Sequence, residues 1–387
     1  MNYVGYKRVS KKRPCCICGK PDWCSFTQNE SISFCARSTT SADRISDQGW
    51  GIYYHFIRKN LTPVNPKKRA TGKYPLQIQS SDQELRDRVY RKLIELSPAA
   101  SNSEIVYGKG GLVERGISDL PRYGSLPKNA ADREMLRDSL IKELEMEPAD
   151  LIGVPGFWKD SGGRIRLWSG YDINDDLMLI PFVGIDGKIQ ACQIRFMKHV
   201  PNKSGHYVWL SSANKPRGCG PGSPLHHVNP GAVSNKSVLV TEGALKAATA
   251  QTFLKDKYVV GNSGVASSHR EIVETARHKN LEIAFDVDSF TNPHVARAMA
   301  GLIRLRYEDQ ESLGYYDDVM IIAWDCSFKG IDEALLAGNQ IKSISVDEWL
   351  HRLSPRCFAE NQNQLSMLQK QKSGRQCYEV SKCSTTP

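Results

Sequence analysis

Short apolar runs that end abruptly in acidic residues mark the second half of the chain. Residues 238–240 read Val-Leu-Val and lead into Thr-Glu-Gly, and residues 283–285 read Ile-Ala-Phe and lead into Asp-Val-Asp. Aliphatic and β-branched runs bounded by polar residues predict buried strands. Residues 244–253 are rich in Ala, Leu and Lys, which predicts a helix directly after the first strand. The pattern therefore predicts an α/β sheet.

Three carboxylates stand where these predicted strands end. They are Glu242 after the first run, and Asp286 and Asp288 after the second. The alternation of a strand predicts that Asp286 and Asp288 point to the same side. Because neighbouring parallel strands end in one crevice, the three side chains should converge there. Such a cluster either repels itself or holds a divalent cation, and hard oxygen ligands suit Mg²⁺ bound together with phosphates.

The pattern changes further upstream. Residues 81–150 have apolar positions three to four residues apart, which predicts a small helical region. Residues 177–182 and 188–196 read as two strands joined by a Gly-rich turn, and residues 207–210 read as another. We therefore expect a small antiparallel region before the α/β sheet.

Five of the eleven cysteines lie in the first 35 residues. Four of them, Cys15, Cys18, Cys24 and Cys35, have the spacing C-x2-C-x5-C-x10-C. Two cysteines separated by two residues fit one tetrahedral Zn²⁺, and a later pair can complete the ligand set. Cys16 competes with Cys15, but it lacks the two-residue gap to Cys18. The spacing predicts a zinc-binding module.

The net charge of +10 is concentrated at the N-terminus. Residues 1–75 hold 14 of the 52 Lys and Arg and 4 of the 42 Asp and Glu, so residues 76–387 are balanced. A basic arm on a neutral body is typical of a nucleic-acid binder, although it could be a solubilising tail. No apolar run is long enough to span a membrane and no signal peptide is evident, so we expect a cytoplasmic protein without a membrane partner.

The composition divides the chain into six parts. The sequence also lacks G-x-x-x-x-G-K-[ST], so it contains no recognisable P-loop motor. The predicted parts are a zinc-binding, DNA-binding module (1–60), a basic linker (61–80), a helical region (81–150), an antiparallel subdomain (151–230), an α/β domain (231–345), and a C-terminal helix with a disordered tail (346–387).

These motifs together resemble the TOPRIM fold of bacterial-type primases, topoisomerases and some nucleases. The likeness rests on T-E-G-A-L-K-A at 241–247 followed by F-D-V-D at 285–288. A strand and glycine loop at 260–265 lies between them. After a third predicted strand, 319–324, the segment K-G-I-D-E at 329–333 resembles the signature that closes the metal site in primases.

Upstream segments narrow the resemblance to DNA primases. Residues 179–182, 186–189, 193–196, 206–212 and 222–226 keep the order of the amino-terminal subdomain of the primase core, which carries a ridge for the template. With the zinc module, the resemblance covers roughly residues 1–60 and 150–345. It is greatest to plasmid- and phage-borne primase-like proteins, with a zinc-ribbon-like module and a small α+β subdomain before the TOPRIM sheet.

Two features depart from the primase pattern. Primases usually have Lys directly before the tyrosine that matches Tyr207, whereas this chain has His206 there and Lys203 nearby. The helicase-docking domain of cellular primases is replaced by a short tail. The first departure leaves the nucleotide-contacting residue open, and the second leaves open how a separate replicative helicase would be held.

The resemblance implies a site for Mg²⁺- or Mn²⁺-dependent primer synthesis from ribonucleoside triphosphates on single-stranded DNA. Glu242, Asp286 and Asp288 would be catalytic metal ligands, with Glu242 alternatively a general acid or base. Outer ligands would come from Asp332, with Asp325 and Glu333 as weaker candidates. The residues expected to contact nucleotide or template are Arg195, Lys203, Tyr207, Lys215, Lys246 and Lys329. Alternatively, Lys246 could lie on the solvent-exposed face of its helix and contact no phosphate.

Two other functions fit parts of the sequence. A TOPRIM nuclease would use the same metal site, and a non-catalytic replication or origin-binding protein would keep the fold as a DNA platform. A topoisomerase needs a tyrosine in a separate cleavage domain, for which the chain has no room. The predicted ridge and the zinc module favour the primase.

Overall fold

The computed structural model describes residues 6–11, 13–18, 20–27, 32–37, 44–45, 50–54, 80–198, 205–232, 236–366 and 368. The chain divides into two compact units, Met1–Gly72 and Lys73–Pro387. Most of the predicted linker and the last 19 residues, 369–387, lie outside the described residues. Within the described ranges, no helix has the length and apolar character needed to cross a membrane.

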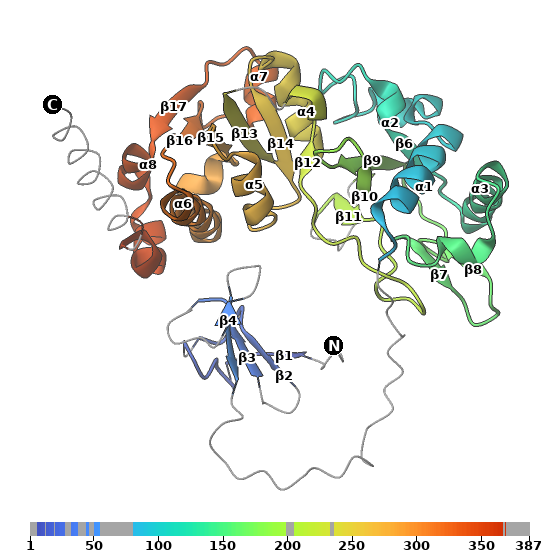
Figure 1. Ribbon diagram of the computed structural model, residues 1–387, viewed down its shortest axis with the longest axis horizontal. Helices are drawn as coiled ribbons and strands as arrows, with labels where there is room; N and C mark the ends of the chain where they lie inside the picture. Colours follow the sequence, from blue (N-terminus) through green and yellow to red (C-terminus); the bar gives the residue numbers. More distant parts are fainter. Residues whose placement is uncertain are drawn as a thin grey trace, which may run out of the picture. The chain divides into compact units, whose positions relative to one another are not determined.

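A five-stranded antiparallel sheet forms the first unit, in the order β1-β2-β3-β5-β4 (Figure 1). Its described core is small and consists of Val9, Phe26 and three cysteines. We expect so small a unit to depend on a metal ion or another cross-link to stay folded. The strands are β1 (Tyr6–Arg8), β2 (Ser25–Thr27), β3 (Ile32–Cys35), β4 (Arg44–Ile45) and β5 (Gly51–Tyr54).

The second unit begins with helices packed on a four-stranded antiparallel sheet, in the order β11-β10-β9-β6. Helix α1 starts where Asp82 accepts a hydrogen bond from the Leu85 amide, and it packs on β10. The helices are α1 (Gln83–Leu96), α2 (Ser103–Tyr107) and α3 (Ala130–Glu143), and the strands are β6 (Gly124–Leu126), β9 (Leu177–Val183), β10 (Ile189–Phe196) and β11 (Tyr207–Trp209). Short 3-10 turns lie at η2 (Ala99–Ser101), η3 (Leu120–Arg122), η4 (Pro148–Leu151) and η5 (Pro230–Ala232).

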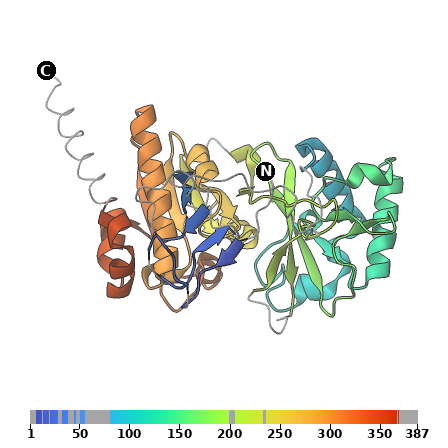
Figure 2. The ribbon, with the colours of Figure 1, turned by 90° about the horizontal axis from the view of Figure 1, so that it is seen from below.

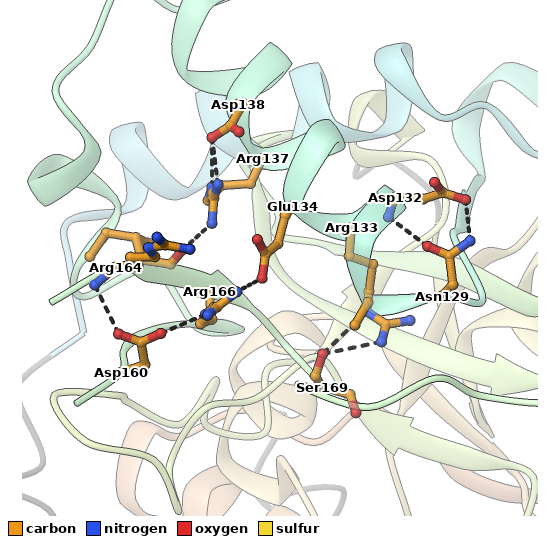
Figure 3. A network of polar contacts seen from close by, with 12 residues as sticks. Asn129, Asp132, Arg133, Glu134, Arg137, Asp138, Asp160, Arg164, Arg166 and Ser169 are labelled. Atoms are coloured by element: carbon orange, nitrogen blue, oxygen red, sulfur yellow. Dashed lines mark hydrogen bonds and ion pairs between the residues drawn. The ribbon is translucent and has the colours of Figure 1, made fainter. Parts of the chain in front are cut away.

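A small hairpin, β7 (Phe157–Lys159) with β8 (Ile165–Leu167), is joined to α3 by charged side chains (Figure 3). Arg166 on β8 pairs with Glu134 of α3 and, at 2.7 Å, with Asp160 in the hairpin turn. The guanidinium of Arg133 is buried and donates to backbone carbonyls, including that of Ser169. These bonds satisfy charges that the packing of α3 would otherwise leave without partners.

The α/β part contains a six-stranded sheet in the order β12-β14-β13-β15-β16-β17. The four central strands are parallel and the two edge strands antiparallel. The strands are β12 (His226–His227), β13 (Ser237–Glu242), β14 (Tyr258–Asn262), β15 (Asn280–Ala284), β16 (Val319–Ala323) and β17 (Lys342–Ser345). The helices are α4 (Ala244–Phe253), α5 (His269–Thr275), α6 (Pro293–Leu313), α7 (Ile331–Leu336) and α8 (Val346–Arg352).

Helices cover both faces of this sheet (Figures 1 and 2). Alternate residues of β13 point to opposite sides: Val238 and Val240 pack in the core with α5, α6 and α8, whereas Leu239 packs in the core with α4 and α7. The α4 core also takes in Met178, Ile180 and Phe182 of β9. The two sheets of the second unit therefore share one continuous hydrophobic core, which fixes the antiparallel region against the α/β part.

The predicted α/β fold class is confirmed, with a parallel sheet, a preceding antiparallel sheet and a small N-terminal antiparallel module. Helix α4 has the predicted bounds, and β9, β10, β11 and β13 lie where the pattern placed strands. Two details differ. The helical region also contains β6, and the strand predicted over 283–285 ends at Ala284 because the chain turns there into η6 (Val287–Phe290).

Candidate metal centres and the acidic site

The structure brings together the four cysteines predicted to bind zinc. The possible ligand atoms of Cys15, Cys18, Cys24 and Cys35 all lie within 4.8 Å of one another. The Sγ atoms of Cys18 and Cys24 are 3.6 Å apart, and those of Cys24 and Cys35 are 3.8 Å apart. A tetrahedron with Zn–S bonds of about 2.3 Å has edges of about 3.8 Å, so the sulfur spacing fits Zn²⁺.

Local contacts decide between Cys15 and Cys16. The Sγ of Cys15 accepts a hydrogen bond from the Ile17 amide, whereas the Sγ of Cys16 lies 3.2 Å from the Ser33 hydroxyl, outside the cluster. A hydrogen bond shared with Cys35, together with burial, raises the pKa of the Cys24 thiol. A divalent cation is the partner that makes the thiolates favourable in so crowded a place.

The acidic residues come from the carboxyl ends of adjacent parallel strands. Glu242 is the last residue of β13 and is paired in register with Asn262 of β14. Asp286 follows β15 as the N-cap of η6, and Asp288 lies inside η6. The expectation that Asp286 and Asp288 alternate along a strand is therefore wrong, because both lie beyond its end. A backbone hydrogen bond of 3.0 Å from Val287 to Lys329 holds η6 against the loop before α7.

The four predicted metal-binding carboxylates are not equally paired. Lys246 of α4 forms an ion pair with one oxygen of Asp286, and the Nζ of Lys329 lies 3.8 Å from the other. Asp332 of α7 forms an ion pair of 3.0 Å with Arg115. Two of the carboxylates thus already contact cations of the chain.

The other two carboxylates have different surroundings. Asp288 accepts a hydrogen bond of 3.1 Å from the Asn292 amide. Glu242 shares its side of β13 with Val238 and Val240, the side that faces α5 and α6. Its neutral neighbour Asn262 is fully buried, and neither polar atom of the Asn262 side chain has a hydrogen-bond partner.

Burial and the neighbouring charges shift the pKa values of this site. Burial, and then the negative charges of Asp286 and Asp288, raise the pKa of Glu242. Burial opposes the charged form of Lys246, but the attraction of Asp286 outweighs it and raises the pKa of that ammonium. Lys246 therefore stays charged at neutral pH, while Glu242 is closer to accepting a proton than an exposed glutamate is.

The oxygen donors of the acidic site suit a divalent cation, but the carboxylates do not by themselves surround one. In the described part of the chain, the cysteine cluster is the only group of three or more His, Cys, Asp or Glu with ligand atoms gathered closely enough for one ion. Oxygen donors nevertheless suit Mg²⁺, which keeps several waters and uses one or two carboxylates with substrate phosphates. The buried Oδ1 of Asp332 and the amide of Asn262 lack partners, as expected where a hydrated ion belongs.

Two weaker acidic candidates serve as turn caps. Asp325 is exposed, and its carboxylate accepts a 2.8 Å hydrogen bond from the Ser327 amide, which lowers the pKa of Asp325. Glu333 accepts a 2.8 Å hydrogen bond from the Lys329 amide at the start of α7. Both side chains therefore have a local structural role, which is to stabilise the turns that contain them.

The predicted nucleotide- and template-binding residues differ in exposure. Arg195 of β10 is buried, and this burial lowers its pKa. Its guanidinium donates a hydrogen bond to the Gly110 carbonyl. Tyr207 is 43% exposed, and its ring lies 5.9 Å from that guanidinium. The Nζ of Lys215 lies 5.0 Å from the Trp158 ring. Lys203 lies outside the described residues.

Sequence reasoning missed two residues of the site. Arg115 lies 217 positions from its partner Asp332, and nothing in its own segment indicated the pairing. Asn262 was visible only as part of the loop between the two acidic motifs. Its alternation with Tyr258 and Val260 along β14 is the signal that would have placed it beside Glu242.

Comparisons with known proteins give a likeness at the level of architecture. No protein-family model matches the chain, and no curated protein matches it either. Among solved structures, it is similar to the Aquifex aeolicus primase zinc-binding and RNA polymerase domains, at 17% identity over 74% of this chain and 75% of that one, with a TM-score of 0.45. A DNA primase domain from Pseudomonas aeruginosa matches at 17% identity, over 69% and 77% of the two chains, with a TM-score of 0.45.

The Escherichia coli primase catalytic core matches in the same way. Its identity is 16%, the match covers 73% of this chain and 83% of that one, and the TM-score is 0.43. The chain thus resembles DnaG-type primase cores at low identity. The roles of individual residues have to come from the geometry above.

Proposed function

We propose that this chain is a primase-type nucleotidyltransferase that makes short RNA primers on single-stranded DNA. The observation that carries the proposal is the placement of Glu242, Asp286 and Asp288 at the ends of adjacent parallel strands, where open α/β sheets bind their ligands. The antiparallel sheet that shares a core with this site supports it, because a template needs a surface fixed relative to the catalytic residues.

In this proposal, Glu242 and Asp288 hold the cation together with the triphosphate of the incoming nucleotide. A bound Mg²⁺ or Mn²⁺ neutralises the triphosphate and polarises the α-phosphorus. The side chain of Lys329 is 75% exposed, so its ammonium can reach the phosphates. In the alternative role, Glu242 acts as a general base instead of binding the cation, and its raised pKa then suits acceptance of the proton from the attacking 3′-hydroxyl.

Template contacts in this proposal come from aromatic and basic side chains. Tyr207 is exposed and can stack on a base, with Arg195 behind its ring. Arg195 therefore supports Tyr207 instead of gripping phosphate itself. Lys215, whose ammonium lies 5.0 Å from the Trp158 ring, and Lys203 remain candidates for template contact from the sequence.

The cysteine module is proposed to bind the single-stranded template. Trp23 lies between two of the clustered cysteines and is 59% exposed, so its ring can stack on an unpaired base. The surplus of ten positive charges in residues 1–75 supplies the attraction for phosphates. A separate replicative helicase and a role in plasmid or phage replication are expected from the sequence resemblance.

One observation favours the alternative of a non-catalytic DNA-binding protein. Asp286 and Asp332 are already paired with Lys246 and Arg115, which reduces the negative charge available to metal ions. A TOPRIM nuclease remains the other alternative, because it would use the same carboxylates.

A priming assay tests the proposal. The full-length protein is incubated with single-stranded DNA, labelled ribonucleotides and Mg²⁺ or Mn²⁺. We expect short RNA products that fall at least ~100-fold in the Asp286→Asn/Asp288→Asn double variant, because metal-site charge carries most of the catalysis. The matched control is Asp325→Asn, an exposed acidic residue at a strand end, which should keep full activity.

Two other outcomes would decide against primer synthesis. Nicked DNA without RNA products, lost in the same double variant, would favour the nuclease. Tight binding of single-stranded DNA with neither product would favour the non-catalytic protein.

A further inference from the structure

The acidic site contains a partly buried cation of its own. Lys246 lies one helical turn after Glu242, because α4 begins immediately beyond the end of β13. Its side chain is 21% exposed and forms an ion pair with Asp286, whose side chain is 8% exposed. The ammonium thus occupies a position inside the site, not on the solvated face of the helix.

The surrounding backbone leaves room for this ammonium. A Cβ atom at Gly330 would lie 3.0 Å from the Nζ of Lys246, closer than side chains ordinarily approach. Gly330 also precedes α7, the helix that carries Asp332. The Lys246 head group therefore lies between Asp286 at the start of η6 and Gly330 at the start of α7.

A second cation neutralises the next carboxylate. Arg115 and Asp332 form an ion pair of 3.0 Å, with side chains 17% and 7% exposed. Lys329 is 75% exposed and 3.8 Å from Asp286, so solvent screens most of its contribution. Two partly buried cations thus balance two of the four carboxylates, whereas among the described residues no ion pair forms with Glu242 or Asp288.

We propose that this site holds one divalent cation, bound by Glu242 and Asp288, and that Lys246 takes the place beside Asp286 that a second cation would need. The inference rests on the proposed function, since it concerns the metal ions of the same site. Two divalent cations about 4 Å apart repel each other strongly and need the full charge of bridging carboxylates. With Asp286 and Asp332 neutralised, that charge is missing. Lys246 is in this reading a positioning residue, which holds Asp286 and sets the charge of the site.

Counting bound Mn²⁺ tests the inference without measuring activity. The full-length protein, with its zinc retained, is titrated with Mn²⁺, and the free ion is followed by electron paramagnetic resonance. We expect about one Mn²⁺ per chain in the unaltered protein. In Lys246→Met, which removes the charge and keeps most of the length, Asp286 becomes available, so a second Mn²⁺ should bind or the first should bind at least about tenfold tighter.

Two further variants control the experiment. Lys255→Met removes an exposed lysine just beyond the end of the same helix and should bind Mn²⁺ as the unaltered protein does. Lys246→Arg keeps the charge and should keep one ion, which separates the effect of charge from a general disturbance of the site. Thermal unfolding shows whether each variant is folded.

The possible results are distinct. Two Mn²⁺ ions in the unaltered protein would overturn the inference and leave the proposed function standing. Weaker binding in Lys246→Met would also overturn it, because Lys246 would then support the ion instead of replacing one. No Mn²⁺ outside the zinc site would overturn both this inference and the proposed metal-dependent function.

Discussion

The two candidate metal sites of this protein are built in opposite ways. In the cysteine module the ligand atoms face one another, with Sγ separations of 3.6 and 3.8 Å that already fit one ion. In the acidic site the carboxylates face cations of the chain, as Asp286 does with Lys246 and Asp332 with Arg115. The first arrangement suits a permanent structural ion, and the second suits an ion that arrives with substrate.

This difference follows from what each site stabilises. The first unit has a small core among its described residues, and we expect it to need a metal ion to fold. The second unit has extensive cores on both faces of its sheet, and we expect these cores to keep it folded whether or not an ion is bound. The fold can therefore tolerate Lys246 and Arg115 in the acidic site. These two cations reduce the net negative charge that is available to bind a substrate and its metal ion.

Breaking the cysteine cluster should have the largest effect. In Cys24→Ser the zinc content should fall from about one ion per chain to near zero, and the first unit should unfold, because structural zinc contributes about 10–16 kcal/mol. Metal analysis and the fluorescence of the module's tryptophans measure both changes. Cys16→Ser is the matched control, since Cys16 lies outside the cluster. Zinc retained in Cys24→Ser would contradict the ligand assignment.

Breaking the buried ion pair of the acidic site should destabilise the second unit. Arg115→Met leaves the Asp332 carboxylate buried without its cation, which costs about 3–5 kcal/mol. Urea unfolding of the full-length protein measures the loss. The double variant Arg115→Met/Asp332→Asn should recover most of it, because no charge then remains to be compensated. A loss that the second substitution leaves unchanged would show that Arg115 acts through packing alone.

The DNA contact proposed for the first unit should have a moderate effect. Trp23→Ala should weaken binding of single-stranded DNA by about 1–3 kcal/mol, because it removes one stacking surface. Fluorescence anisotropy with a labelled oligonucleotide measures the affinity, and removal of residues 1–75 should in addition flatten its salt dependence. Tyr171→Ala is the control, as an aromatic residue of the second unit that is 78% exposed. An equal loss of DNA affinity in both variants would show that Trp23 contributes no more than another exposed aromatic residue.

The smallest effect concerns the pH dependence of stability. The folded protein raises the pKa of Glu242 above its ordinary value of 4.5, so this residue stabilises the fold at low pH and loses that contribution as pH rises through the folded pKa. Without added divalent cations, the stability of Glu242→Gln should therefore increase relative to that of the unaltered protein as the pH rises above 4.5.

Unfolding in urea across this pH range checks the prediction. Well below pH 4.5 the difference between the two proteins should become independent of pH, because Glu242 is then protonated in both the folded and the unfolded protein. Glu311→Gln, at an exposed position near the end of α6, is the control and should show no such trend. A difference that stays constant across the range would contradict the raised pKa.

The sequence by itself determined the elements whose causes are local. The bounds of α4, the strand before it and the cysteine spacing all follow from neighbouring residues, because helix propensity, apolar runs and ligand loops act over short stretches. The α/β class followed in the same way from the order of these elements. Strand alternation does not predict where a strand ends, however. The predicted strand was extended past Ala284, where the chain instead turns into η6.

Only the tertiary structure decided what each charged side chain meets. It paired Lys246 with Asp286 and brought Arg115 to Asp332 across 217 positions. It also buried Arg195 under the loop at Gly110. A charge interacts with whatever the fold brings within a few ångströms, and burial decides how strongly. The acidic strand ends could therefore be found in the sequence, whereas the charge that they offer to a metal ion is set by residues that lie far away in the chain.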